Sequence, residues 1–193
     1  MSLPHRPGET AVLERDDLQL LLDELMRRGY EIVGPVIKSQ AIVYDRLSSL
    51  EDLPAGWTDE QEGGAYRLKK RDDEALFGYA AGPHSWKKFL LPARLRLWQT
   101  DDRLNFVEGR EEPERLAFVG ARACDLQAVA IQDAILMKGP YEDPTYRSRR
   151  ERTFIVAVNG GCGGGTCFCV SMGTGPRARF QSRRGNCNSI PGV

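Results

Sequence analysis

The chain has no excess of charge of either sign, because 27 lysines and arginines balance 27 aspartates and glutamates among its 193 residues. A strongly basic protein would attract nucleic acid or an anionic membrane surface, and this balance favours neither partner. Long apolar runs are also missing. One of the longest, at residues 154–158, is far shorter than the roughly 20 residues that span a bilayer. We therefore expect no nucleic-acid partner and no membrane insertion.

Motifs of stand-alone enzymes are scarce as well. The two histidines, His5 and His84, lie far apart in the sequence, and a lone histidine is usually a surface or hydrogen-bonded core residue. The glycine-rich segments at residues 163–166 and 173–175 are not followed by the Gly-Lys-Ser/Thr of a phosphate-binding loop. The sequence therefore predicts no stand-alone catalyst.

The N-terminus lacks the apolar stretch and small-residue cleavage site of a secretory signal, so we expect a cytoplasmic protein. The chain has 5 cysteines, an odd number for a set of disulfide bridges. In a reducing compartment, clustered thiols more often bind a metal or react than form bridges.

Hydrophobic periodicity predicts an α/β fold in which a mixed α+β half precedes a βαβ unit. Residues 16–28 carry leucines at helical spacing, which predicts a packing helix. The acidic stretch with glycine and proline at residues 48–64 is expected to be a surface loop. Strands are expected at residues 30–37 and 41–44, as a hairpin, and at residues 65–69 and 75–80.

The back half predicts the βαβ unit with parallel strands. Continuous apolar runs at residues 116–119 and 153–158 are typical of fully buried strands. Between them, residues 125–136 predict a helix with Asp125 near its N-cap, followed by a polar crossover at residues 141–152. One face of this helix is expected to be buried, with Leu126, Val129, Ala130 and Ile135.

Three segments follow from this order. We expect an α+β lobe over residues 1–100, a βαβ lobe over residues 101–176 and a divergent basic tail over residues 177–193. Near the first boundary, His84 or Ser85 begins a helical turn that Pro92 ends. Its aromatic side chains are expected to anchor in the core, and the alternative is a docking patch for a partner, made by Trp86, Phe89, Lys87 and Lys88.

Topology brings four cysteines to one edge of the predicted sheet. Cys124 follows the first buried strand, whereas Cys162, Cys167 and Cys169 follow the second. The carboxyl ends of parallel strands open onto the same edge, where α/β proteins usually build their sites. Four thiolates suit a tetrahedral Zn²⁺ or an iron–sulfur cluster. The positive end of the following helix is expected to stabilise the thiolate of Cys124.

The spacing of these cysteines favours a cluster over zinc. Structural zinc sites pair their ligands in knuckles two to four residues apart, whereas Cys124 stands alone and one residue separates Cys167 from Cys169. The glycines between residues 160 and 165 leave backbone N–H groups free to point at bridging sulfides. Two alternatives stay open: a zinc-stabilised interaction module without redox activity, and unligated or redox-active thiols.

Two motifs carry a resemblance to a known family. They are Gly-Ala-Arg-Ala-Cys-Asp-Leu-Gln-Ala-Val at residues 120–129 and Gly-Thr-Cys-Phe-Cys-Val-Ser-Met-Gly-Thr-Gly-Pro at residues 165–176. Both resemble the family that contains the iron–sulfur subunit of anaerobic sulfite reductase and the beta subunit of sulfhydrogenase, and the resemblance covers about residues 12–176. It implies an iron–sulfur electron-transfer subunit with [4Fe-4S] clusters. The implied partners are a reductase subunit that binds flavin and nicotinamide, and a catalytic subunit of the sulfite reductase or nickel–iron hydrogenase type.

The chain departs from that family at two places. A cysteine commonly follows the asparagine directly in the family, whereas Gly160 follows Asn159 here and the nearest thiol is that of Cys162. The ferredoxin-type cysteine runs of the family's C-terminal half are missing, and the basic residues from Arg177 onward do not resemble it. We therefore expect a truncated or frame-shifted copy, in which Cys187 is a tail thiol without a ligand role.

Overall fold

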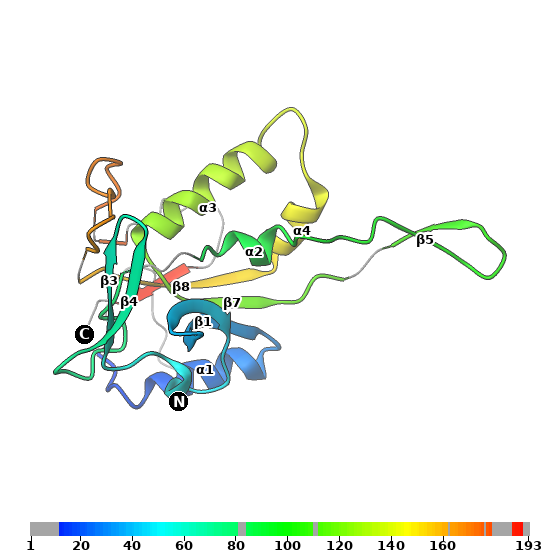
Figure 1. The fold of residues 1–193 in the computed structure, drawn as a ribbon. Coiled ribbons are helices and arrows are strands. Elements are labelled where there is room, and N and C mark those ends of the chain that lie inside the picture. Colours follow the sequence, from blue (N-terminus) through cyan, green and yellow to red (C-terminus); the bar gives the residue numbers. More distant parts are fainter. Residues whose placement is uncertain are drawn as a thin grey trace.

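Strands from both halves of the chain form one mixed sheet in the order β2-β1-β7-β8-β9 (Figure 1). The computed structural model describes residues 12–80, 84–109, 112–161, 163–175, 177–178 and 187–190. Four strands run parallel and β2 runs antiparallel to β1, so the predicted α/β class is confirmed. The strands are β1 (Glu31–Lys38), β2 (Ala41–Arg46), β7 (Leu116–Ala121), β8 (Thr153–Val158) and β9 (Cys187–Ile190).

Helices cover both faces of this sheet and give a three-layer arrangement (Figure 1). On one face, α1 (Leu18–Arg27) buries Leu22 and Leu25 against the sheet. On the other face, buried side chains of the remaining helices pack on the sheet around Phe118. These helices are α2 (Lys87–Leu90), α3 (Ala123–Leu136) and α4 (Pro144–Glu151).

The two strands of the βαβ unit are apolar on both faces, as their sequences predict. All six residues of β7 are buried, and so are the last four of β8. Side chains alternate along a strand, so Phe118 joins the core under α3 while its neighbour Val119 joins the core over α1. Burial on both faces explains why the buried positions of these runs contain no polar residue.

Two predictions for the front half are wrong. The expected surface loop at residues 48–64 contains a short helix, η1 (Leu50–Asp52), and the strand β3 (Trp57–Glu62). That strand pairs with the predicted strand β4 (Ala65–Lys70) in a hairpin that stands apart from the main sheet. The expected strand at residues 75–80 is not a strand. Its last residues bond to side chains rather than to a neighbouring strand: Tyr79 C=O accepts from Arg122, and Ala80 N–H donates to Asp59.

The crossover of the βαβ unit also differs from its prediction, because residues 141–152 contain the helix α4. Asp143 caps this helix by accepting hydrogen bonds from the backbone N–H groups of Thr145, at 2.9 Å, and Tyr146, at 3.0 Å. Pro144 at the first helical position suits the start of a helix.

The face of α3 is buried only in part. Leu126 and Val129 are buried, as predicted, whereas Ala130 and Ile135 are exposed to solvent. The prediction of one buried face is therefore wrong at these last two residues. Nothing in the described residues covers the outer side of this helix.

Trp86 lies in the core, as the first interpretation of its segment predicts. Its side chain is 2% exposed and stacks on Tyr44, at 3.9 Å between ring centroids, and on Phe118, at 4.7 Å. Phe89 is partly buried against the same core. The alternative, a docking patch built on Trp86, is wrong because partners cannot reach a buried ring.

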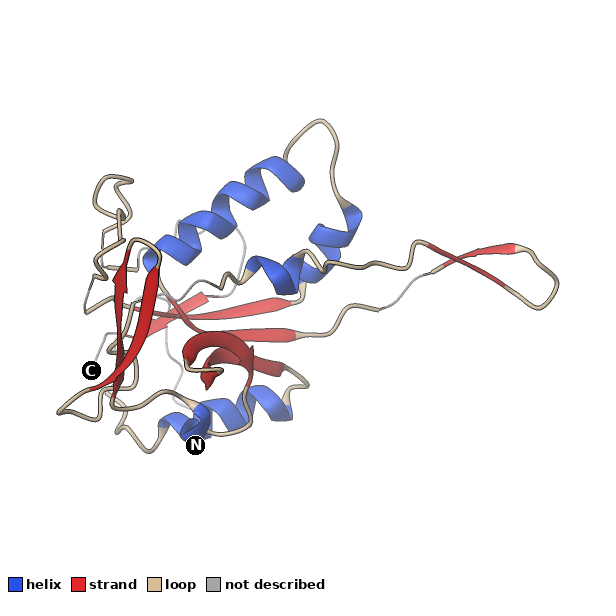
Figure 2. Ribbon diagram, viewed as in Figure 1, coloured by secondary structure: helices blue, strands red, loops and turns tan. Residues whose placement is uncertain are grey.

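A two-stranded arm projects from the body between α2 and β7 (Figure 2). It consists of β5 (Trp98–Thr100) and β6 (Phe106–Glu108), which pair only with each other. All residues from 93 to 107 are exposed. The boundary expected between the two lobes, after residue 100, falls within this arm. Among the described residues, no helix is long and apolar enough to cross a membrane.

Candidate metal centre

Cys124 occupies the second position of α3, directly after β7. Arg122 is the N-cap of the helix, and its backbone N–H donates to the carboxylate of Asp125 at 2.9 Å. This capping bond places a negative charge at the helix start. Partial burial of the thiol, and next the carboxylate of Asp125, raise the pKa of Cys124. The expected stabilisation of its thiolate by the helix start is therefore outweighed.

A bulge at Gly120 sets the direction in which β7 runs into α3. The pairing of β7 with β8 shifts between Val119 and Ala121, and Gly120 has a φ of +90°. A Cβ at this position would lie 2.9 Å from the ring of Phe77 and 3.3 Å from Pro35. Only glycine tolerates both the backbone angle and the close approach.

A buried arginine lies beside Cys124. Arg122 is 7% exposed, its guanidinium donates to Tyr79 C=O, and it lies 4.8 Å from the centre of the Tyr79 ring. Burial raises the pKa of Tyr79, so this phenol stays neutral at physiological pH. The segment at residues 75–80 therefore holds the positively charged guanidinium of Arg122 next to the Cys124 thiol. The sequence predicts a strand for this segment, but the structure has a coil there.

The loop after β8 carries Cys167 and Cys169. Cys167 is exposed and Cys169 is partly buried. The backbone N–H of Gly164 donates to Cys167 Sγ at 3.2 Å, and the N–H of Cys167 donates back to Gly164 C=O at 3.0 Å. The N–H of Ala178 donates to the Asn159 side chain at 2.9 Å, which joins the beginning of this segment to its end.

The hairpin of β3 and β4 holds this loop in place. Thr166 Oγ1 donates to Gln61 Oε1 at 2.9 Å, and Gln61 donates to Asp59 at 2.6 Å. Asp59 also accepts from the N–H of Ala80 at 2.6 Å. One chain of hydrogen bonds therefore connects the cysteine loop, β3 and the segment that holds Arg122.

The cysteine loop and the start of α3 lie at the same end of the sheet, beside the β3–β4 hairpin (Figure 1). The parallel pairing of β7 with β8 produces this arrangement, as the sequence predicts. The described residues nevertheless include no group of three or more histidines, cysteines, aspartates or glutamates that could hold a metal ion. Cys162 lies outside the described residues, as does the side chain of Cys187, whose backbone belongs to β9.

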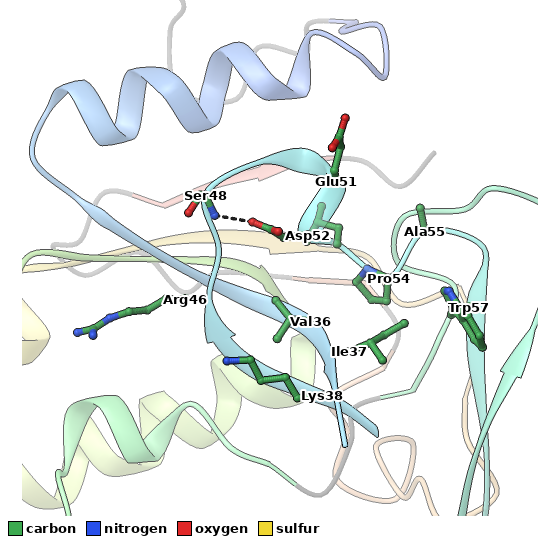
Figure 3. Close-up of a pocket in the computed structure, with 11 residues that line it drawn as sticks. Val36, Ile37, Lys38, Arg46, Ser48, Glu51, Asp52, Pro54, Ala55 and Trp57 are labelled. Atoms are coloured by element: carbon green, nitrogen blue, oxygen red, sulfur yellow. Dashed lines mark hydrogen bonds between the residues drawn. The ribbon is translucent and has the colours of Figure 1, made fainter. Parts of the chain in front are cut away.

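An open pocket lies elsewhere, between the β1–β2 hairpin, η1 and the start of β3 (Figure 3). Several of its charged groups already have partners. Lys38 pairs with Asp45 at 2.5 Å, Arg46 pairs with Glu114 at 2.8 Å, and Asp52 accepts from the N–H of Ser48 at 2.7 Å. None of the described residues that line it is a cysteine. This pocket therefore contributes nothing to the thiol-bearing edge.

Comparison with protein-family models, curated proteins and solved structures found no significant match.

The sequence does not identify three residues of this edge as part of a site: Asp59, Gln61 and Arg122. The first two lie on β3, within a stretch whose acidic composition resembles a loop. One sequence signal could have identified β3. The Gly63-Gly64 pair that follows this strand is typical of a hairpin turn, and it joins β3 to the predicted strand β4. No sequence signal shows that Arg122 is buried, since arginines are mostly exposed.

Proposed function

We propose that the protein is an iron–sulfur electron-transfer subunit of a cytoplasmic oxidoreductase complex. Cys124, Cys162, Cys167 and Cys169 would hold a [4Fe-4S] cluster at the carboxyl edge of β7 and β8. When bound, the cluster supplies one-electron transfer. The observation that carries the proposal is the pair of cysteine-bearing segments, one after each strand of a parallel pair, at one end of the sheet.

The residues present fit a cluster in their chemistry. Thiols are the usual ligands of iron–sulfur clusters, and hydrogen bonds to sulfur tune the reduction potential of such sites. The Gly164 N–H already donates such a bond to Cys167, and the buried guanidinium of Arg122 supplies positive charge beside Cys124. None of the residues 163–175 is buried, so moving this loop toward Cys124 disturbs no core packing.

The resemblance of residues 120–129 and 165–176 to subunits of sulfite reductase and sulfhydrogenase supports the same function. From this resemblance we also propose two partners. They are a reductase subunit that binds flavin and nicotinamide, and a catalytic subunit of the sulfite reductase or nickel–iron hydrogenase type. The chain itself carries no nucleotide fingerprint, so both the electron donor and the acceptor would be separate proteins.

The test is the metal content of protein purified without oxygen. We expect iron and acid-labile sulfide in equal amounts and a broad absorption at about 400 nm that fades on reduction. Colourless protein with one zinc per chain would instead support the zinc-stabilised interaction module. Protein without stoichiometric iron or zinc after reconstitution would contradict both.

Single variants identify the ligands. Cys124→Ser, Cys162→Ser, Cys167→Ser and Cys169→Ser should each lower bound iron, because oxygen replaces thiolate poorly in a soft site. Cys187→Ser is the matched control and should retain the wild-type iron content. Full iron in the Cys162→Ser variant alone would mean that the fourth ligand comes from elsewhere. Equal iron in all five variants would refute the proposed ligand set.

A further inference from the structure

The arm formed by β5 and β6 exposes an unusual number of large apolar side chains. Trp98 is 62% exposed, Phe106 78% and Leu104 81%, and Leu95, Leu97 and Val107 are exposed as well. An isolated two-stranded hairpin is marginally stable in water at best. Single apolar residues on a surface are ordinary, but six on one short arm indicate a contact surface.

Both faces of the arm carry apolar side chains. Phe106 pairs with Thr100, two residues from Trp98 on the same strand, so the two aromatic residues belong to one face of the ribbon. Val107 pairs with Gln99, which places Val107 and Leu97 on the opposite face. A ribbon that lies on a flat surface buries one face only, and the face with Trp98 and Phe106 carries both aromatic side chains of the arm.

A second unpartnered apolar surface lies on α3. The exposed residues of this helix after Cys124 are Gln127, Ala128, Ala130, Ile131, Ala134 and Ile135. Its two charged residues are both engaged: Asp125 caps the helix, and Asp133 bonds to Tyr146 Oη at 2.7 Å and pairs with Arg150 at 3.2 Å. A solvent-facing helix normally carries charged residues on its outer side, and this one carries none.

The exposed surfaces of the arm and of α3 are both rich in apolar side chains. The arm offers large side chains, whereas the exposed residues of the helix include three alanines beside Ile131 and Ile135. The arm contains three arginines and three acidic residues between residues 93 and 109, and the whole chain has a net charge of +0. No like-charge repulsion therefore opposes the contact of one chain with another.

The dimensions agree with such a contact. Residues 94–102 of the arm reach about 30 Å when extended, and the 14 residues of α3 span about 21 Å. The exposed apolar side chains of the arm amount to roughly 500 Å². A standard interface buries about 800 Å² on each partner, of which a little over half is apolar. In a two-fold dimer each copy contributes one face of its arm and the exposed face of its α3, and together these supply the apolar part of one side.

We propose that the chain forms a two-fold symmetric dimer in which the arm of each copy lies over α3 of the other. Two-fold pairs are the commonest oligomers, and each contact occurs twice in such a dimer. The arm projects from the end of the sheet opposite to the cysteine loop (Figure 1).

Sedimentation equilibrium of the full chain over a range of micromolar concentrations tests this proposal, and it requires no bound metal. We expect the wild type to be a dimer. Trp98→Glu with Phe106→Glu in the arm, and Ile131→Glu with Ile135→Glu on α3, should each raise the dimer Kd by about 30-fold or more. All four residues are exposed, so the folded monomer should persist, and circular dichroism checks this.

Leu20→Glu is the matched control, because Leu20 on α1 and Ile135 on α3 are both 63% exposed. This variant should remain a dimer. A photo-crosslinking residue at position 106 should attach to residues 127–135 of the other copy in a mixture of isotopically light and heavy chains. A wild type that stays monomeric, or a dimer that survives both double substitutions, would overturn the proposal.

Discussion

The buried strands of the βαβ unit and the loop that follows β8 are neighbours in the chain but are held by different forces. All six residues of β7 are buried among apolar side chains. None of the residues 163–175 is buried, and the loop is held by a few hydrogen bonds, from Thr166 to Gln61 and from Gly164 to Cys167. The strands are ordered by the hydrophobic effect, whereas the loop has little packing of its own.

This difference separates the part of the molecule that determines stability from the part that can respond to a ligand. Segments with few apolar contacts open at low free-energy cost, and binding sites are drawn from such segments. The Cys167 loop can therefore rearrange around a ligand while the sheet beneath it stays intact. Substitutions in the two regions should have effects of very different size.

The largest difference in the free energy of unfolding is expected between alanine variants of two phenylalanines of this unit. Phe118 in β7 is 1% exposed and packs on Trp86, so Phe118→Ala should lower the free energy of unfolding by about 3–5 kcal/mol. Phe168 in the loop is 69% exposed, so Phe168→Ala should change it by less than about 0.5 kcal/mol. Urea denaturation followed by circular dichroism measures both values. Similar losses in the two variants would show that the loop belongs to the core.

An intermediate difference is expected between alanine variants of two glycines within the loop, in how firmly the loop contacts β3. A Cβ on Gly165 would lie 2.7 Å from the backbone oxygen of Gln61, whereas a Cβ on Gly163 would meet nothing within 4 Å. Gly165→Ala should therefore push the loop away from β3 and destabilise this contact by about 1 kcal/mol. Gly163→Ala should have no effect. Hydrogen exchange of residues 163–169 reports the contact, and equal protection in both variants would show that the loop does not dock on β3.

The smallest effect is expected at an exposed ion pair of α1. Hydrogen bonds from Arg27 and then Arg28 lower the pKa of Glu24 from 4.5 to about 2. A lowered carboxylate pKa adds stability above pH 4.5, and this contribution is lost as the pH falls toward 2. The stability difference between wild type and Glu24→Gln should be small at neutral pH and should vanish at low pH. An NMR titration of the Glu24 carboxyl with a midpoint near 4.5 would contradict this assignment.

The sequence predicts those elements whose apolar pattern repeats with a clear period. The helix α1, the β1–β2 hairpin, β4 and the strands β7 and β8 are predictable because burial on one or both faces dictates their residues. The strand β3 is not predicted because it contains polar residues in place of an apolar pattern. Two of these, Asp59 and Gln61, form hydrogen bonds at the candidate site. The segment from Ala75 to Ala80 has the composition of a strand, but composition does not show which partner a backbone group finds.

The candidate site is predictable in its location but not in its surroundings. Parallel order of β7 and β8 is enough to place Cys124 and the Cys167 loop at one edge. The raised pKa of Cys124 is not predictable, because it depends first on burial of the thiol and then on the side chain of Asp125, which turns back to cap its own helix. The exposure of Ala130 and Ile135 is not predictable either, since an apolar helix face has the same sequence pattern whether it packs within its own chain or against another.

The bulge at Gly120 has a consequence for how this site can change during evolution. Gly120 lies within β7, between the paired residues Val119 and Ala121, so it affects the direction in which the chain enters the helix that carries Cys124. Loss of this one residue would leave the apolar positions of the strand in register up to Val119 but would rotate every later side chain of the unit. A single-codon deletion could therefore reposition the thiol while β7 keeps its core contacts up to Val119, and only Ala121, which is also buried in the core, would be displaced within the strand. The geometry of the edge can thus vary at this junction while most of the strand stays unchanged.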